Sequence, residues 1–171
     1  AVPLPQSFQA HVEAAIGQLP TPAVVTQSET PRYRTEWTPE IDDDDDDCGD
    51  ADEAAHSYVP IDPCQCVIAA LRFAMGEHIP RAFIDLETAR WQPESNVLPD
   101  AYALKKVSLE RFAAAMLPAV ARPRRQQVAD RCAHMGRRLA ELEASYDSIL
   151  LVCSVLEWPW IREAYQNALS D

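Results

Sequence analysis

The chain has 171 residues, 47% hydrophobic and 25% charged, which fits one globular domain of ordinary size; no apolar run approaches the roughly 20 residues of a membrane span. Its net charge of −12 is concentrated in residues 42–53, where nine acidic residues stand without any Lys or Arg, leaving 18 acidic against 15 basic residues elsewhere. Because no basic stripe balances this block, nucleic acid is excluded as the expected partner.

The chain opens without a basic segment followed by an apolar one, so we expect no signal peptide. Its five cysteines are odd in number, and Cys64 and Cys66 are too close together to cross-link anything within one helical turn. Reduced thiols in a cytoplasmic protein are the simplest interpretation.

The first 26 residues predict a strand, a helix and a second strand. Residues 1–4 have the composition of a strand end, and Ser7 is suited to cap a helix. Apolar residues then recur at helical spacing: Phe8, Val12, Ile16 and Leu19. Residues 23–26, Ala-Val-Val-Thr, are typical of a central strand. Two strands that flank one helix indicate a parallel crossover.

Residues 28–57 lose this periodicity and predict an acidic, largely mobile insertion. The aspartate run at 42–47 is a conceivable Ca²⁺ site, but it lacks the spaced ligands and the turning glycine of an EF-hand loop. A solvated acidic loop is therefore the preferred interpretation.

Residues 58–87 predict a loop, a helix and a strand. Asp62 can cap a helix that begins near Cys64, and apolar residues then recur every three or four positions. Residues 81–86, Arg-Ala-Phe-Ile-Asp-Leu, are short and apolar, as in a buried strand. Asp85 falls near the carboxyl end of that strand, where open α/β sheets bind their ligands.

Residues 91–146 form a predicted helical region, with helices expected at 101–106, 109–120 and 124–146. Residues 148–153, Ser-Ile-Leu-Leu-Val-Cys, then have the length and content of a buried strand, and residues 158–169 predict a closing helix. Together these patterns predict a single α/β domain: a short, mainly parallel sheet of about four strands, covered by helices and carrying the acidic insertion.

Two stretches resemble the TraB, TIKI, erythromycin esterase and ChaN-like superfamily. The first, YVPIDPCQCVIAALRFAMGEHIPRAFIDLE at residues 58–87, is similar in its helix that leads into a strand ending in an Ile-Asp pair. The second, RCAHMGRRLAELEASYDSILLVCSVLEWPWI at residues 131–161, is similar in the Arg and Met that open a helix running into a strand and a turn. The positional matches that the resemblance implies are Asp85, Arg131, Met135 and Glu157.

The resemblance also implies catalytic groups that this sequence lacks. The hydrolases of the superfamily share two catalytic residues: the His of a Gly-x-x-His motif on an early strand and a Glu on the next strand. They often use a divalent metal as well. Here no Gly-x-x-His precedes the first helix. The sequence Val-Pro-Leu-Pro at residues 2–5 resembles the Val-Glu-Leu-Pro of relatives, but Pro3 stands in place of the Glu. Glu157 occupies the place of a His in the later turn, so a degenerate member of the superfamily is expected.

Asp85, Glu87 and Glu157 are the candidate catalytic residues, because they lie near the carboxyl ends of predicted strands that would meet at one edge of the sheet. An oxygen-rich cluster of this kind suits a hard divalent cation, with Asp85 and Glu157 as its ligands, or general acid–base chemistry. The alternative is that each carboxylate caps or solvates a loop. Cys64 and Cys66 with His56 contain soft zinc ligands, but no second pair of ligands completes such a site.

The candidate binding residues are concentrated in the aromatic C-terminal segment: Trp158, Trp160 and Tyr165, with Arg131 upstream. Trp, Tyr and Arg dominate binding hot spots, so this segment is a candidate surface for a protein partner or for a second copy of the chain. The alternative is that the rings cover the edge of the sheet.

Two hypotheses of function follow from these patterns. The preferred one is a TraB/ChaN-like α/β domain without catalysis that serves binding or assembly. The alternative is a metal-dependent hydrolase in which the carboxylate cluster at the strand ends holds a cation that activates water.

Overall fold

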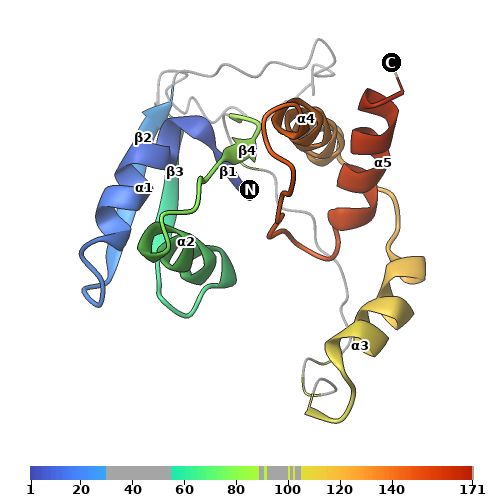
Figure 1. Cartoon of the computed structure of the whole chain (residues 1–171), viewed down its shortest axis with the longest axis horizontal. Helices are drawn as coiled ribbons and strands as arrows, with labels where there is room; N and C mark the ends of the chain where they lie inside the picture. Colours follow the sequence, from blue (N-terminus) through green and yellow to red (C-terminus); the bar gives the residue numbers. More distant parts are fainter. Residues whose placement is uncertain (30–54, 89–90, 92–99, 101, 103–104, 171) are drawn as a thin grey trace, which may run out of the picture.

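The computed structural model of the chain describes residues 1–29, 55–88, 91, 100, 102 and 105–170 (Figure 1). Strands and helices follow one another as β1 (Val2–Pro5), the 3₁₀ helix η1 (Gln6–Phe8), α1 (Gln9–Ile16), β2 (Ala23–Glu29), β3 (Ala55–Ile61), α2 (Cys66–Gly76), β4 (Phe83–Asp85), α3 (Leu109–Met116), the 3₁₀ helix η3 (Leu117–Ala119), α4 (Gln126–Glu143) and α5 (Trp158–Ala168). Helices and strands are mixed and include a short parallel sheet, so the predicted α/β class is confirmed.

The parallel sheet consists of β1 and β4, which both come from predicted strands. Val2 lies opposite Phe83 and Pro5 opposite Asp85, and the Val2 amide donates to the carbonyl of Ala82 at 3.0 Å. The two strands run in the same direction, so their carboxyl ends, including Asp85, lie at one edge.

The second sheet corrects the predicted topology. β2 was expected to lie parallel to the first strand, but it pairs antiparallel with β3, from Ala23 opposite Ile61 to Glu29 opposite Ala55. β3 begins inside the predicted insertion and continues through the predicted loop. From His56 to Ile61, exposed side chains such as Tyr58 alternate with half-buried ones and with buried Ile61, which is the pattern of a half-buried strand. The aspartate run of the insertion lies outside the described residues.

The segment at 148–153 is extended, but it is not a regular strand. The Ala1 nitrogen donates to the Leu150 carbonyl at 2.7 Å, and the Val152 amide donates to the Ala1 carbonyl at 3.1 Å. These two bonds join the segment to Ala1, the residue before β1, and Leu150 is strongly exposed. Among the described residues only two strands are parallel, so the predicted sheet of about four strands is not found there.

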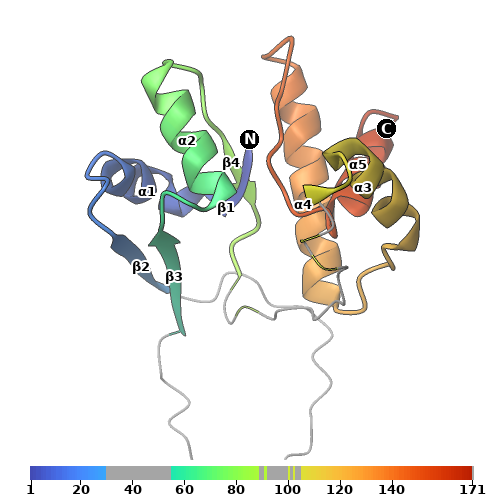
Figure 2. The same ribbon diagram turned by 90° about the horizontal axis from the view of Figure 1, so that it is seen from below.

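Two hydrophobic cores lie on opposite sides of the parallel pair, because successive side chains of a strand point to opposite faces. Phe83 belongs to the first core with residues of β1, α1, β3 and α2, whereas its neighbour Ile84 belongs to the second core with residues of α4 and α5. Figures 1 and 2 show the same arrangement, with β1 and β4 between the α1–α2 half and the α4–α5 half. The end of β4 is thus the place where the two halves meet.

The predicted helices are confirmed where the structure describes them. α2 begins at Cys66, with Gln65 rather than Asp62 as its N-cap, and Asp62 accepts a hydrogen bond from the Cys64 amide at 2.8 Å in the turn before the helix. Ser108 caps α3 as predicted, because its side chain accepts a hydrogen bond from the Arg111 amide at 3.4 Å. The apolar stripe of α4 is buried at Val128, Cys132, Met135 and Leu139. The run predicted at 101–106 falls largely outside the described residues. No helix among those described is both long and apolar enough to cross a membrane.

Candidate functional site

Asp85 ends β4 with a side chain that is only 3% exposed. Its Oδ1 accepts a hydrogen bond from the Leu86 amide at 2.8 Å, which fixes the carboxylate just beyond the strand. A buried carboxylate needs a cation or several hydrogen-bond donors to offset its lost hydration. The partner of Asp85 therefore decides whether this carboxylate is available for chemistry at the edge of the sheet.

That partner is Arg131 of α4, whose side chain is 4% exposed. Its Nη2 lies 2.6 Å from Asp85 Oδ2, and its Nε lies 3.0 Å from Oδ1 and 3.1 Å from Oδ2 of the same carboxylate. Two donor nitrogens facing two oxygens form the fork-shaped pair that guanidinium and carboxylate favour. The ring of Trp91 covers the guanidinium, with Arg131 Cζ 4.0 Å from the ring centroid.

Glu157 completes this network from the residue before α5. Its Oε1 accepts a hydrogen bond from Arg131 Nη1 at 3.0 Å, and its side chain is 17% exposed. Burial raises the pKa of Glu157 above its ordinary value, and nearby Asp85 adds to this while Arg131 opposes it. Asp85 and Glu157, which the sequence predicts to meet at the strand ends, therefore do come together, with the Arg131 guanidinium between them.

Two cysteines lie beside this Arg131 network, and neither has the properties of a nucleophile. Burial, followed by the charge of Glu157, raises the pKa of Cys132 to about 12, and the same two causes raise that of Cys153 to about 11. A thiol acts as a nucleophile through its thiolate, so the raised pKa values disfavour the reactive form of both sulfurs at neutral pH.

The predicted metal site does not fit this arrangement. A cation shared by Asp85 and Glu157 would have to lie where the Arg131 guanidinium already pairs with both carboxylates. Within the described part of the chain, no three His, Cys, Asp or Glu side chains are grouped as a metal ion would require. The third candidate, Glu87, is half-buried two residues beyond Asp85. Cys64 and Cys66 are both exposed free thiols.

The aromatic C-terminal segment divides between the two alternatives that the sequence leaves open. Trp160 packs against the second core, donates from Nε1 to the Ala121 carbonyl at 3.2 Å and lies under the Arg122 guanidinium. Trp158 and Tyr165 line a pocket of about 210 Å³ between α4, α5 and the segment before α5, and Tyr165 also packs against the second core. Arg131, the fourth candidate binding residue, is buried in its ion pairs.

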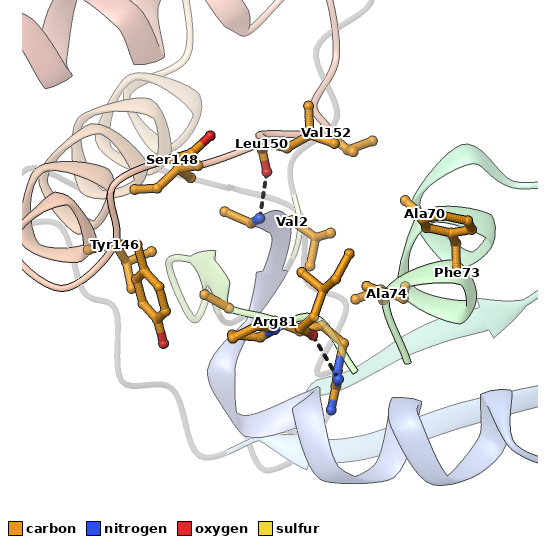
Figure 3. A pocket seen from close by; sticks show the side chains of 16 residues that line it. Val2, Ala70, Phe73, Ala74, Arg81, Tyr146, Ser148, Leu150 and Val152 are labelled. Carbon is orange, nitrogen blue, oxygen red and sulfur yellow. Dashed lines mark hydrogen bonds between the residues drawn. The ribbon is translucent and has the colours of Figure 1, made fainter. Parts of the chain in front are cut away.

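A second pocket lies at the opposite end of the parallel strands and has no counterpart in the sequence-based predictions. It measures about 450 Å³ and is bounded by α2, by the turn between α2 and β4, by the first residues of β1, and by the end of α4 with residues 146–152 (Figure 3). Exposed Phe73 and Leu150 lie on its wall. The sequence gave one indirect signal of this pocket: Phe73 is a large apolar residue of α2 that lies off the buried stripe of that helix.

Comparison with known proteins gives no relative: no protein-family model, no curated protein and no solved structure matches the chain. The superfamily resemblance therefore stays a prediction. Two of its positional matches, Asp85 and Arg131, form an ion pair with each other.

Proposed function

We propose that this chain is a non-catalytic α/β binding domain, distantly similar to the TraB/ChaN-like superfamily. In this proposal the strand-end carboxylates have a structural role: they hold the α4–α5 half against β4. The binding role belongs to apolar surfaces away from them.

One observation carries the proposal: the buried guanidinium of Arg131 is bonded to both candidate catalytic carboxylates. All three of its nitrogens donate, two to Asp85 and one to Glu157. Either carboxylate would have to leave a buried ion pair before it could accept a proton from a substrate or bind a cation. Breaking such a pair costs about 3–5 kcal/mol. A carboxylate held in this way is therefore poorly placed to act as a catalytic base.

The exposed apolar side chains support the binding role. Phe73 is 66% exposed and Leu150 is 78% exposed, and both border the 450 Å³ pocket. Large apolar side chains that gather around a concavity are typical of binding sites, whereas single ones scattered over a surface are not. The four described cysteines are free, which is consistent with the expected cytoplasmic location.

Calorimetric titration of the chain with Mn²⁺ and with Zn²⁺, together with assays of ester and peptide hydrolysis, tests the proposal. We expect no stoichiometric metal binding that depends on Asp85 and no hydrolysis above the buffer rate. Asp85→Asn is the test variant. Asp130→Asn is its control, because Asp130 lies next to Arg131 but pairs with Gln126 at 2.8 Å.

The metal-dependent hydrolase is the outcome that would overturn this proposal. One equivalent of metal bound by the parent chain and by Asp130→Asn, but lost in Asp85→Asn, would establish a cation site at the strand ends. The proposal would also be overturned if the parent chain hydrolysed a substrate and this activity disappeared in Asp85→Asn and Glu157→Gln while both variants stayed folded.

A further inference from the structure

We infer that the 450 Å³ pocket at the amino ends of β1 and β4 is a binding site for an uncharged, mainly apolar small molecule that carries one hydrogen-bonding group. This inference rests on the proposed binding function and deepens it by naming the class of ligand. The volume lies within the range of roughly 300–1,000 Å³ that is usual for small-molecule sites.

The pocket has an apolar wall and a more polar wall. Ala70, Phe73 and Ala74 of α2 lie on one side, and Tyr146 and Ser148 lie across from them (Figure 3). The α2 wall offers only carbon surface from these side chains, whereas Tyr146 and Ser148 each carry a hydroxyl group that can donate or accept. A ligand with an apolar body and one hydroxyl or carbonyl group matches this division.

The lining holds two groups that can carry a charge, the Arg81 guanidinium and the Ala1 amino group, and both are hydrogen-bonded within the chain. Arg81 is the one charged side chain among the lining residues, and its Nε and Nη2 lie 2.9 and 3.2 Å from the Glu13 carboxylate of α1. Its Nη1 donates to the Ile79 carbonyl at 3.0 Å. The Ala1 amino group donates to the Leu150 carbonyl at 2.7 Å, and burial lowers its pKa, which disfavours its charged form. Because the guanidinium is used by its partners and burial disfavours the ammonium, an ionised ligand would lose its hydration with little counter-charge to gain.

An extended peptide is less suited to this pocket than a small molecule. A peptide that adds to a sheet edge needs a row of unpaired amides and carbonyls. Around the pocket, the carbonyls of Ile79, Arg81 and Leu150 accept from Arg81, Gln9 and Ala1, respectively. The amides of Ile79 and Val152 donate to Ala74 and Ala1. These five backbone groups are therefore already bonded within the chain.

Titration of the full chain with the neutral dye Nile red, followed by fluorescence, tests the inference. We expect a saturable signal with one equivalent of dye. Decan-1-ol should displace the dye, whereas ionised decanoate, which has the same chain and a charged end, should compete about tenfold or more weakly.

Two neighbouring alanines of α2 provide the matched variants. Ala70 lines the pocket, whereas Ala69 is exposed and outside it. Ala70→Phe should fill the pocket and weaken dye binding about tenfold or more, and Ala69→Phe should leave it unchanged. Leu150→Asp serves as a second test that spares the core, since Leu150 is mostly exposed, and it should weaken binding similarly by adding a charge to the wall.

Several results would overturn the inference. They are dye binding that never saturates, equal affinities for Ala70→Phe and Ala69→Phe, competition by decanoate as strong as by decan-1-ol, or displacement by an uncharged peptide but not by decan-1-ol. None of them changes the metal and hydrolysis measurements, which test the strand-end carboxylates independently of this pocket.

Discussion

Gly136 of α4 faces Ala164 of α5 so closely that a Cβ atom built on Gly136 would lie 2.5 Å from the Cβ of Ala164. The same atom would lie 2.7 Å from the backbone nitrogen of Tyr165. Only a residue without a side chain allows the two helices to approach this far. The close packing of α4 on α5 brings Glu157, immediately before α5, within hydrogen-bond distance of Arg131, one and a half turns before Gly136.

Gly136→Ala should lower the free energy of unfolding by about 1–3 kcal/mol, because backbone atoms of α5 must move to admit the methyl group. Unfolding in urea, followed by circular dichroism, measures the change. Gly76→Ala is the matched control, since a Cβ on Gly76 meets nothing within 4 Å, and it should be neutral or stabilising by up to about 1 kcal/mol. Equal stabilities of the two variants would contradict the close helix contact.

Arg131→Met should destabilise the chain by about 3–5 kcal/mol, because it leaves the buried carboxylates of Asp85 and Glu157 without their cation. The same urea unfolding experiment measures the loss. Arg122→Met is the control: Arg122 pairs with Glu163 at 2.9 Å, but the two side chains are 69% and 44% exposed, so the loss should stay within about 1 kcal/mol. A small effect at Arg131 would show that its ion pairs do not hold the two halves together.

The contrast between Asp85 and β2 explains what the sequence could predict. The short apolar run around Asp85 identifies a strand, and the amphipathic stripe around Arg131 identifies a helix, because burial periodicity is local. Their ion pair joins residues 46 positions apart, and no local pattern specifies it. The strand predicted at 23–26 is present as β2, which extends to Glu29, but the predicted neighbour was wrong, because a short β-branched run identifies a strand and not the strand that pairs with it.

The pocket was missed for a related reason. Its walls come from the end of α2, the start of β1 and the segment after α4, so it exists only once these elements pack. Leu150 has the sequence context of a buried strand, yet it is exposed, and its segment is hydrogen-bonded to Ala1 rather than paired with a strand. The exposure of an apolar residue is decided by what covers it, and the sequence around Leu150 does not contain that information.

Glu157 and Glu13 should give opposite pH dependences of stability. Burial raises the folded-state pKa of Glu157, so the folded chain binds this proton more tightly than the unfolded chain does. Its contribution to stability should therefore fall as pH rises from the ordinary value of 4.5 through the higher folded pKa. The difference in unfolding free energy between the parent chain and Glu157→Gln, measured over this interval, should decrease with rising pH.

Glu13 provides the control of opposite sign. Its hydrogen bond from Arg81 lowers the folded-state pKa, so its contribution is fully present above the ordinary value of 4.5 and is lost as pH falls through the lower folded pKa. Subtracting the unfolding free energy of Glu13→Gln from that of the parent chain should thus give a difference that decreases with falling pH. Two differences that change in the same direction would be inconsistent with the burial of Glu157.

The cysteines should separate by reactivity with a thiol-specific disulfide reagent, with each site identified by mass spectrometry. Cys64 and Cys66 are exposed, so both should be modified first in the folded chain. Cys132 and Cys153 should react at least about tenfold more slowly, because burial hides the sulfurs and raises their pKa values to about 12 and about 11. In urea these four of the chain's five cysteines should react at similar rates. If Cys132 reacted as fast as Cys64 in the folded chain, the α4–α5 half would have to open readily. The Arg131 network could then not be what holds the two halves together.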